Sequence, residues 1–480
     1  MRRRLAGQYH LVKPLGVSLL TFPQRHARGF VDDSPIRPFR LPFLPLYRYL
    51  PVMREAEAGL AVISGTRLTD QIGVGVLTRL IDRDLVDDVI AETGRAEQRS
   101  RLLPARVVVY YVLSLCLFFG YAYEEVMRLL VAGLHFTGAW QKDWHVPTTG
   151  AITQARQRLG SAPLRLLFER VAVPCAQRGT RGAWLGSRRL MAIDGFVLDV
   201  PDTKENDSAF GRSGGEKNPA PFPQVRMVGL GECGTHAIVA ARLAPWRASE
   251  RALALELIAD FEPGMLIIAD RGFCSWQLWQ AAAASGADLL WRIQDGPNLP
   301  VVRTFPDGSY ESFLLDPKVR GRRATQRHRG SANIEEPSGI PVRVIEYEVT
   351  NREGKGEIFC LITTIMDPEE ATAAELAAAY QERWEFESSL DEIKTHQRGR
   401  GGVLRSKSPE MIRQEIWALL LTHYAIRHLM CEAADQAGKD PDRLSFMRSL
   451  RVIRRQVTGQ AALSPLQASE RPRRDSRGNP

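Results

Sequence analysis

Cysteine is scarce in this chain of 480 residues, and its six cysteines are spread singly along the sequence. No two of them form a Cys-x-x-Cys pair, which disfavours a zinc finger. Isolated cysteines in a chain of this length suit a reducing compartment better than a disulfide scaffold. We therefore expect a cytoplasmic protein.

Long apolar runs are also scarce. The longest, Val107 to Tyr123, is slightly short for a bilayer span and is followed at once by Glu124 and Glu125. We interpret it as a buried helix. The first residues are basic, but the apolar run after them is short and broken, so no signal peptide is predicted.

The excess of positive charge is modest. Lys and Arg number 64 against 55 Asp and Glu, which gives a net charge of +9. This balance permits an anionic partner such as nucleic acid without requiring one. Apolar residues make up 44% of the chain, enough to bury a sizeable core.

The apolar pattern changes along the chain and predicts a multi-part α/β protein. Apolar residues at three- and four-residue steps predict an N-terminal helical domain, which could pack on a core or hold DNA. Short runs bounded by Gly, Pro and Asp then predict strands that alternate with helices in a mixed sheet. The predicted parts are a poorly ordered extension (1–60), the helical domain (61–182), the α/β core (183–295 and 366–435), a β-rich insertion (296–365), and a basic helix with a disordered tail (436–480).

Two basic stretches remain open in interpretation. The stretch KVRGRRATQRHRG, residues 318–330, contains Arg320, Arg322 and Arg323 and is predicted to be a charged loop between hairpins. It is either a solvated loop or a contact to the DNA backbone, which would be sequence-independent. The stretch SFMRSLRVIRRQV, residues 445–457, is predicted to be a basic amphipathic helix that contacts DNA or forms a dimer.

Two aspartates stand in unusual positions. Asp194 lies inside the apolar run LMAIDGFV, where a buried carboxylate costs several kcal/mol unless it is paired or binds a metal. Asp270 ends the run MLIIAD, and acids at strand ends are where α/β sheets place ligand chemistry. The alternative for each is a structural turn acid.

The stretch YQERWEFESSLDEIK, residues 380–394, is predicted to lie in one helix that begins after Asp367 and Pro368. At about 100° per residue, Arg383, Glu387 and Lys394 fall within about 60° of Tyr380, and Trp384 flanks this stripe. One face would then hold an acid between two cations, with aromatic rings alongside. The alternative is a solvated face with i,i+4 ion pairs.

Together the three acids suggest a metal site. Two strand aspartates and one helix glutamate can hold two divalent cations, and hard oxygen ligands suit Mg²⁺ or Mn²⁺. Two such ions activate a water or a 3′-hydroxyl and stabilise the leaving oxygen of a phosphodiester. Cations beside the acids could grip neighbouring phosphates.

The spacing Y-x2-R-x3-E-x6-K of Tyr380, Arg383, Glu387 and Lys394 resembles the signature of the IS4-family DDE transposases of bacterial insertion sequences. The contexts AIDG at Asp194 and IIADRGF at Asp270 resemble the two aspartate strands of that family, and the likeness spans about residues 65 to 435. Phe196 departs from the pattern, because many relatives have a small hydroxyl residue there.

The resemblance implies a ribonuclease H-like (retroviral integrase-like) core. It implies that Asp194, Asp270 and Glu387 are the catalytic residues and bind two Mg²⁺ or Mn²⁺ ions. It implies that Arg383 and Lys394 contact DNA phosphates with support from Tyr380, and that Trp384 could stack on a displaced base.

The resemblance also implies partners and a location. The helical domain would bind the terminal inverted repeats, and a homodimer would synapse two double-stranded transposon ends before they join target DNA. The protein would then be nucleoid-associated in a bacterial cytoplasm. Two alternatives stay open: an inactive copy that represses by binding DNA, and a metallonuclease of the same fold that lacks strand transfer.

Overall fold

The structure is a computed structural model. It describes residues 72–99, 101–132, 145–215, 217–294, 299–329, 339–350, 356–399 and 402–458, together with the backbone of strands β1 (Gln8–Leu11) and β2 (Leu20–Thr21). Most of the predicted extension (residues 1–60) and the predicted tail after residue 458 lie outside the described residues.

Five strands form the centre of a large sheet. They run in the order β8-β7-β4-β9-β10, where β4 is antiparallel to β7 and parallel to β9, β7 is antiparallel to β8, and β10 is parallel to β9. This order is that of the ribonuclease H-like fold, so the predicted fold class is confirmed. The bounds are β4 (Arg188–Asp199), β7 (Gln224–Glu232), β8 (Ala237–Pro245), β9 (Met265–Ala269) and β10 (Asp288–Arg292).

The strands of the β-rich region continue this sheet. β14 pairs antiparallel with β10, and β13, β12 and β11 follow beyond it in hairpins. The predicted hairpins are present in this region, because β11 pairs antiparallel with β12 and β13 pairs antiparallel with β14. The bounds are β11 (Arg303–Thr304), β12 (Tyr310–Leu315), β13 (Gly339–Thr350) and β14 (Gly356–Thr363); β1 also pairs with β13, and β3 (Trp184–Leu185) pairs with β4.

The basic stretch after β12 is helical, so the prediction of a charged loop is wrong. Helix α10 (Pro317–His328) begins where the side chain of Asp316 accepts a hydrogen bond from the Lys318 N–H at 2.7 Å. An Asp followed by Pro is a common helix start. The Arg, Ala and Gln residues that follow favour a helix, and no β-branched run opposes it.

Each face of the sheet is covered by helices. On one face lie α8 (Glu250–Leu257) and α9 (Trp276–Ala283), and the rings of Trp279 on α9 and Trp291 on β10 meet edge to face with centroids 5.1 Å apart. The opposite face is covered by α13 (Pro409–Gln436), a buried helix that packs on β8. The short helix α7 (Lys204–Phe210), between β4 and β7, was not predicted.

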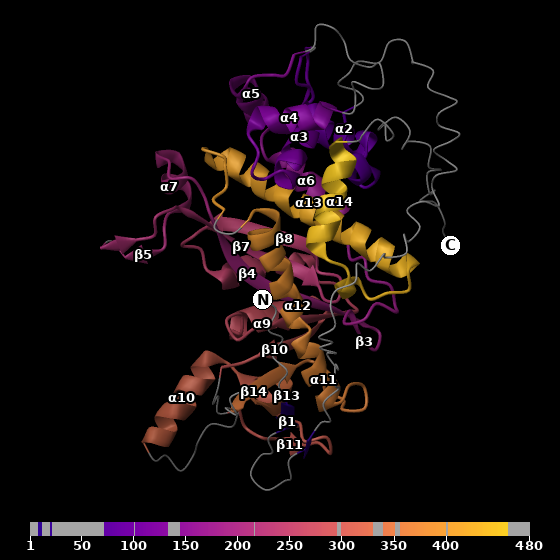
Figure 1. Cartoon of the computed structure of the whole chain (residues 1–480). Helices are drawn as coiled ribbons and strands as arrows, with labels where there is room; N and C mark the ends of the chain where they lie inside the picture. The colour runs from indigo at the N-terminus through magenta and orange to yellow at the C-terminus, as the bar shows by residue number, and fades with distance from the viewer. Residues whose placement is uncertain are drawn as a thin grey trace, which may run out of the picture.

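The N-terminal helices gather at one end of the molecule, and the strands β11 to β14 lie at the other (Figure 1). Helix α13 connects the helical end to the central sheet, because it contacts α3 and α6 on one side and β8 on the other. The bounds of this helical layer are η3 (Gly75–Arg79), α2 (Arg83–Glu92), α3 (Ala105–Leu117), α4 (Tyr123–Val131), α5 (Thr149–Leu159), α6 (Ala162–Val171) and α14 (Phe446–Thr458). The longest apolar run supplies α3, which is buried as predicted, and within the described residues no helix is long and apolar enough to cross a membrane.

The helix predicted over the stretch YQERWEFESSLDEIK is divided. It forms α11 (Ala373–Gln381), α12 (Arg383–Asp391) and a π-helical turn, η6 (Glu392–Gln397). The predicted start after Asp367 is also wrong, because a capping box of Thr372 and Glu375 begins α11. A π-turn changes the angle between the residues on either side of it, and such turns are frequent at functional sites.

Candidate active site

The pleat of β4 places Asp194 beneath the helices. Leu190, Ala192 and Leu198 belong to the core shared with α13, whereas Met191 belongs to the core on the opposite face. Side chains alternate between faces along a strand, so Asp194 shares the face of Leu190 and Ala192. Its Oδ1 accepts a hydrogen bond from the Gly195 N–H at 2.7 Å.

Asp270 follows the neighbouring strand on the same face. Leu266 and Ile268 of β9 belong to the core shared with α13, so residue 270 continues their alternation. Because β9 and β4 are parallel, with Ala269 opposite Ile193, the two aspartates come from adjacent strand positions. The first two predicted site residues are therefore neighbours.

Two glycines of β7 let α12 approach the sheet. A Cβ atom at Gly231 would lie 2.1 Å from the ring of Phe386, and one at Gly229 would lie 3.3 Å from it. Phe386 is buried against these glycines and draws α12 onto the strand next to β4. This packing brings Arg383 and Glu387 over Asp194, and no local sequence signal predicted it.

Arg383 connects two of the three acids. Its Nη1 lies 2.8 Å from Oε1 of Glu387, one helical turn away, and 3.5 Å from Oδ2 of Asp194. The Arg383 side chain is 8% exposed, so its charge is shielded from water. A guanidinium thus occupies a place between two carboxylates where a cation is favoured.

The environment of these groups changes their proton affinity. Burial raises the pKa of Asp194 to about 6; the charges of Glu387 and Asp270 add to this rise, while the Gly195 N–H and Arg383 oppose it. Burial lowers the pKa of Arg383, but nearby Tyr380 and the acids outweigh it and leave the pKa raised. The negative charge of the three acids therefore favours the binding of further cations at this site.

The residues fit a divalent metal. Three ionised carboxylates offer only oxygen acceptors, which Mg²⁺ and Mn²⁺ prefer. Asp194, Asp270 and Glu387, all of them described, are not drawn together as tightly as the ligands of a single ion. The chemistry of these donors fits a divalent cation, whereas their spacing is wider than the ligand set of one bound ion.

The other predicted residues of the stretch surround Arg383 in different ways. Tyr380 is only 2% exposed, and its ring centroid lies 5.9 Å from Cζ of Arg383. Trp384 is 46% exposed, with its ring centroid 5.1 Å from the same atom. Tyr380 is placed to support the arginine from below, and Trp384 is open to a partner.

Lys394 contacts Phe196, the residue that departs from the family pattern. It lies in the π-turn, and its Nζ is 4.6 Å from the ring centroid of Phe196. Burial lowers the pKa of Lys394, and the charges of Asp194 and Asp391 oppose this effect. Phe196 is buried beside the acids, so the bulky residue forms part of the platform for Lys394.

The arginines of α10 are not brought to this site. Figure 1 shows α10 projecting from the β-rich end, apart from α12. Arg320 and Arg322 are exposed on it, whereas Arg323 is buried. Any DNA contact of α10 would be separate from the three acids.

A second group of potential metal ligands was missed by the sequence analysis. His236, Glu385 and Asp442 have ligand atoms within 4.8 Å of one another. Nδ1 of His236 lies 2.5 Å from Nη2 of Arg427, which can only donate, so we infer that Nδ1 accepts and that the proton is on Nε2. A metal on Nε2 would force an N–H of His236 against an N–H of Arg427, so this group does not fit a metal.

This second group instead holds α12 and the π-turn in place. Arg427 of α13 forms two bonds with Glu392, the first residue of the π-turn, and His423 lies 3.1 Å from the same carboxylate. His236 bonds Glu385, which precedes Glu387 by two residues and so faces away from it. His423 is fully buried.

Comparisons with known proteins agree with this geometry. Residues 71–169 match the family described as "Insertion element 4 transposase N-terminal", and residues 185–424 match the family described as "Transposase DDE domain". Among individual proteins, the chain is 31% identical over 390 residues to "Transposase InsG for insertion sequence element IS4" of Escherichia coli (strain K12), covering 80% of this chain and 83% of that protein. It is 28% identical over 209 residues to "Putative transposase InsZ" of the same organism, covering 43% of this chain and 67% of that protein.

Among solved structures, the piggyBac transposase synaptic complex with hairpin DNA matches with a TM-score of 0.43 and 10% identity, covering 83% of this chain and 81% of that chain.

The matched DDE domain defines the class of enzyme: the chain is a DDE transposase, a class that depends on divalent metal ions. More narrowly, it belongs to the IS4 family of insertion-sequence transposases. The resemblance predicted from the four-residue signature is confirmed.

Proposed function

We propose that this transposase binds the terminal inverted repeats of its insertion sequence and moves it by cut-and-paste DNA cleavage and strand transfer. Asp194, Asp270 and Glu387 are the catalytic, metal-binding residues. The observation that carries the proposal is the position of Arg383, held between Asp194 and Glu387 at 3.5 and 2.8 Å over the sheet. Charges from two strands and one helix meet there, as metal-dependent phosphodiester chemistry requires.

The acids would hold two Mg²⁺ or Mn²⁺ ions, which supply Lewis acidity and activate the attacking water or 3′-hydroxyl. The residues themselves set the geometry for this step. Asp194 and Asp270 are fixed by adjacent strands, and Glu387 is fixed by the packing of α12 on β7. Rigid elements of this kind preserve the spacing that catalysis needs.

Arg383 and Lys394 bind phosphates of the transposon end. Both lie beside the acids, and a guanidinium can form two parallel bonds with a phosphate. Tyr380 holds Arg383 from below by ring contact. Trp384, exposed beside Arg383, stacks on a base displaced from the duplex.

The remaining assignments complete the proposal. The helical domain (61–182) binds the inverted repeats, and the core (183–295 and 366–435) performs the chemistry. The β-rich insertion (296–365) contributes backbone contacts through the exposed Arg320 and Arg322, whereas Arg323 is buried and makes no such contact. Two copies synapse two double-stranded ends and deliver them to target DNA. The enzyme works at the nucleoid of a bacterial cytoplasm.

A cleavage assay tests the proposal. Purified protein is incubated with a labelled duplex carrying the DNA that flanks its gene, in Mg²⁺ or in EDTA, beside the Asp270→Ala variant. Metal-dependent cutting at the element's end by the wild type alone is the expected result. Binding without cutting in either condition would contradict the catalytic assignment and support a DNA-binding copy that represses.

A further inference from the structure

A cavity of about 380 Å³ lies among the N-terminal helices, away from the three acids. Its walls come from the segment that joins α2 to α3 and from the C-terminal end of α5, and buried Leu103 and Val108 form part of the lining. The volume lies within the range of small-ligand sites. None of the catalytic residues proposed above lines this cavity.

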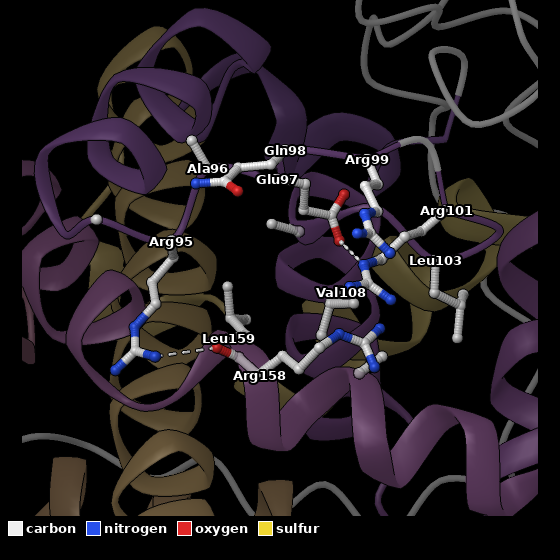
Figure 2. Close-up of a pocket in the computed structure, with 13 residues that line it drawn as sticks. Arg95, Ala96, Glu97, Gln98, Arg99, Arg101, Leu103, Val108, Arg158 and Leu159 are labelled. Atoms are coloured by element: carbon white, nitrogen blue, oxygen red, sulfur yellow. Dashed lines mark hydrogen bonds and ion pairs between the residues drawn. The ribbon is translucent and has the colours of Figure 1, made fainter.

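Arginine dominates the lining of this cavity. Arg95, Arg99, Arg101 and Arg158 line it, and Glu97 is the one acid among the described residues that do so. Figure 2 shows the guanidinium groups of Arg99, Arg101 and Arg158 gathered on one side, near the Glu97 carboxylate. Four cations face one anion, so the cavity carries an uncompensated positive charge.

The ion pairs within the cavity do not remove this charge. Arg101 pairs with Glu97 at 3.7 Å, a long separation between partly exposed side chains, and such a pair contributes little. Within the described residues no acid pairs with Arg95, Arg99 or Arg158, although their neighbours form many ion pairs. Gathered like charges repel, and an anion between them relieves that repulsion.

A purely structural role does not account for Arg158. Cations in the last turn of a helix commonly bond its free carbonyl groups. On α5 this is done by Arg95, whose Nη1 donates to the carbonyl oxygen of Arg158 at 3.2 Å. The neighbouring Arg156 is buried and bonds Gln414, Tyr123 and Ser406, which ties α5 to α13. Among the residues that the structure describes, no side chain bonds the guanidinium of Arg158, which is therefore available to a ligand.

We infer that this cavity, named here the arginine pocket (Arg95, Arg99, Arg101 and Arg158), binds a backbone phosphate of double-stranded DNA within the transposon end. The inference rests on the proposed function, since it assigns a contact to the helical domain. Planar guanidinium groups match the oxygens of a phosphodiester, and arginines from two segments can grip one phosphate from two sides. The pocket belongs to other elements than α12, so the phosphate held here is not the one that is cut.

The test measures DNA binding in EDTA, where no chemistry occurs. Fluorescence anisotropy gives the affinity of wild type and of the Arg99→Ala/Arg158→Ala double variant for the flanking duplex over a series of salt concentrations. Each lost phosphate contact lowers the slope of log affinity against log salt by about 0.9. Because the pocket holds one phosphate, we expect the double variant to lose up to about 0.9 in slope and about tenfold in affinity. A scrambled duplex loses affinity to the same degree, because phosphate contacts carry no sequence information.

Two matched variants separate charge from folding. Arg128→Ala removes an exposed arginine of the same helical layer that pairs with Glu124 and Glu125, and it should leave the slope unchanged. Arg99→Lys/Arg158→Lys keeps the charge and should keep most of the slope. If the double alanine variant binds like wild type, the pocket assignment is overturned while the proposed function stands.

Two further outcomes are distinguishable. A wild type that binds no duplex would overturn both the pocket and the proposed function. Inorganic phosphate provides the last arm: if it raises the melting temperature of wild type and not of the double alanine variant, yet DNA binding is equal in both, the pocket serves a free phosphate compound and the DNA assignment fails.

Discussion

Nη1 of Arg383 lies 3.5 Å from Oδ2 of Asp194, although the two residues come from a helix and a strand far apart in the sequence. The same nitrogen lies 2.8 Å from Glu387, so one buried cation balances two acids. Such a cation stabilises the two acids, and under the proposed function it is also placed to meet an incoming phosphate. The three groups are best tested one at a time.

Removing the cation should disable the site. In Arg383→Ala, Asp194 and Glu387 lose the cation that lies between them and keep only Lys394 nearby, and the phosphate loses its guanidinium. We expect cleavage at saturating DNA to fall by about 10²-fold or more. Arg383→Lys keeps a charge but loses the planar fork, so partial activity is expected. Single-turnover cleavage rates measure both variants. Unchanged activity in Arg383→Ala would support the alternative that this helix face only forms i,i+4 ion pairs.

Removing the charge of Glu387 should separate chemistry from binding. The amide in Glu387→Gln keeps the size of the side chain but is a weaker metal ligand. Cleavage should be abolished, whereas binding of the flanking duplex, measured by anisotropy in EDTA, should stay within about twofold. An equal collapse of binding would show that Glu387 is structural.

Neutralising Asp194 should stabilise the metal-free enzyme. Its pKa of about 6 is raised by burial, so its contribution to stability is complete below about pH 4 and is lost as the pH rises through 6. Asp194→Asn carries no charge at any pH. At pH 8 we expect it to be about 1–2 kcal/mol more stable than wild type, a value reduced for the partial exposure of the side chain.

The measurement is urea unfolding from pH 4 to pH 8 in EDTA. The difference between Asp194→Asn and wild type should grow across this range. Added Mg²⁺ should stabilise wild type more than the variant, because the variant keeps only Asp270 and Glu387 as carboxylate ligands. A constant difference at every pH would contradict the burial of this charge.

The network behind α12 should matter for stability. Burial alone would raise the pKa of Glu392, but the charge of Arg427 and the bond from His423 outweigh it and hold the pKa at about 2. Arg427→Leu leaves this carboxylate buried without its cation, and we expect a loss of about 3–5 kcal/mol. Arg427→Leu/Glu392→Leu removes both charges and should recover most of it. Denaturant unfolding of the full double-mutant cycle measures the coupling, and additive losses would show that the pair does not interact.

The exposed ring of Trp384 can be removed to test base stacking with little effect on stability. Trp384 is 46% exposed, so Trp384→Ala should change the unfolding free energy by less than about 1 kcal/mol. If the ring stacks on a displaced base, Trp384→Ala should slow cleavage while Trp384→Phe retains most of the rate. Fluorescence of 2-aminopurine near the cleavage site should be quenched by wild type and not by the alanine variant. Equal quenching in both would contradict stacking.

Much of the site was predictable because its signals are local. Asp194 lies inside an apolar run, and Asp270 ends one. A carboxylate in such a run marks a candidate functional residue, and this can be seen without knowing the tertiary structure. The five central strands were predicted from their own apolar residues and confirmed. Two predictions are wrong. The stretch predicted as a charged loop forms α10, which begins at an Asp-Pro pair. The division of the long helix has no marker such as Pro in the sequence.

The sequence by itself determined the chemical groups, the strands that carry two of them and the family to which the chain belongs, because these depend on residue identity and short spacing. Only the tertiary structure decided that Arg383 lies between Asp194 and Glu387. It did so through Gly229 and Gly231, which let Phe386 draw α12 onto β7. It also decided the bonds of His236 and Arg427 to α12 and the π-turn, which join segments remote in sequence. Contacts of this kind arise from packing between elements, and no periodicity within one element contains them.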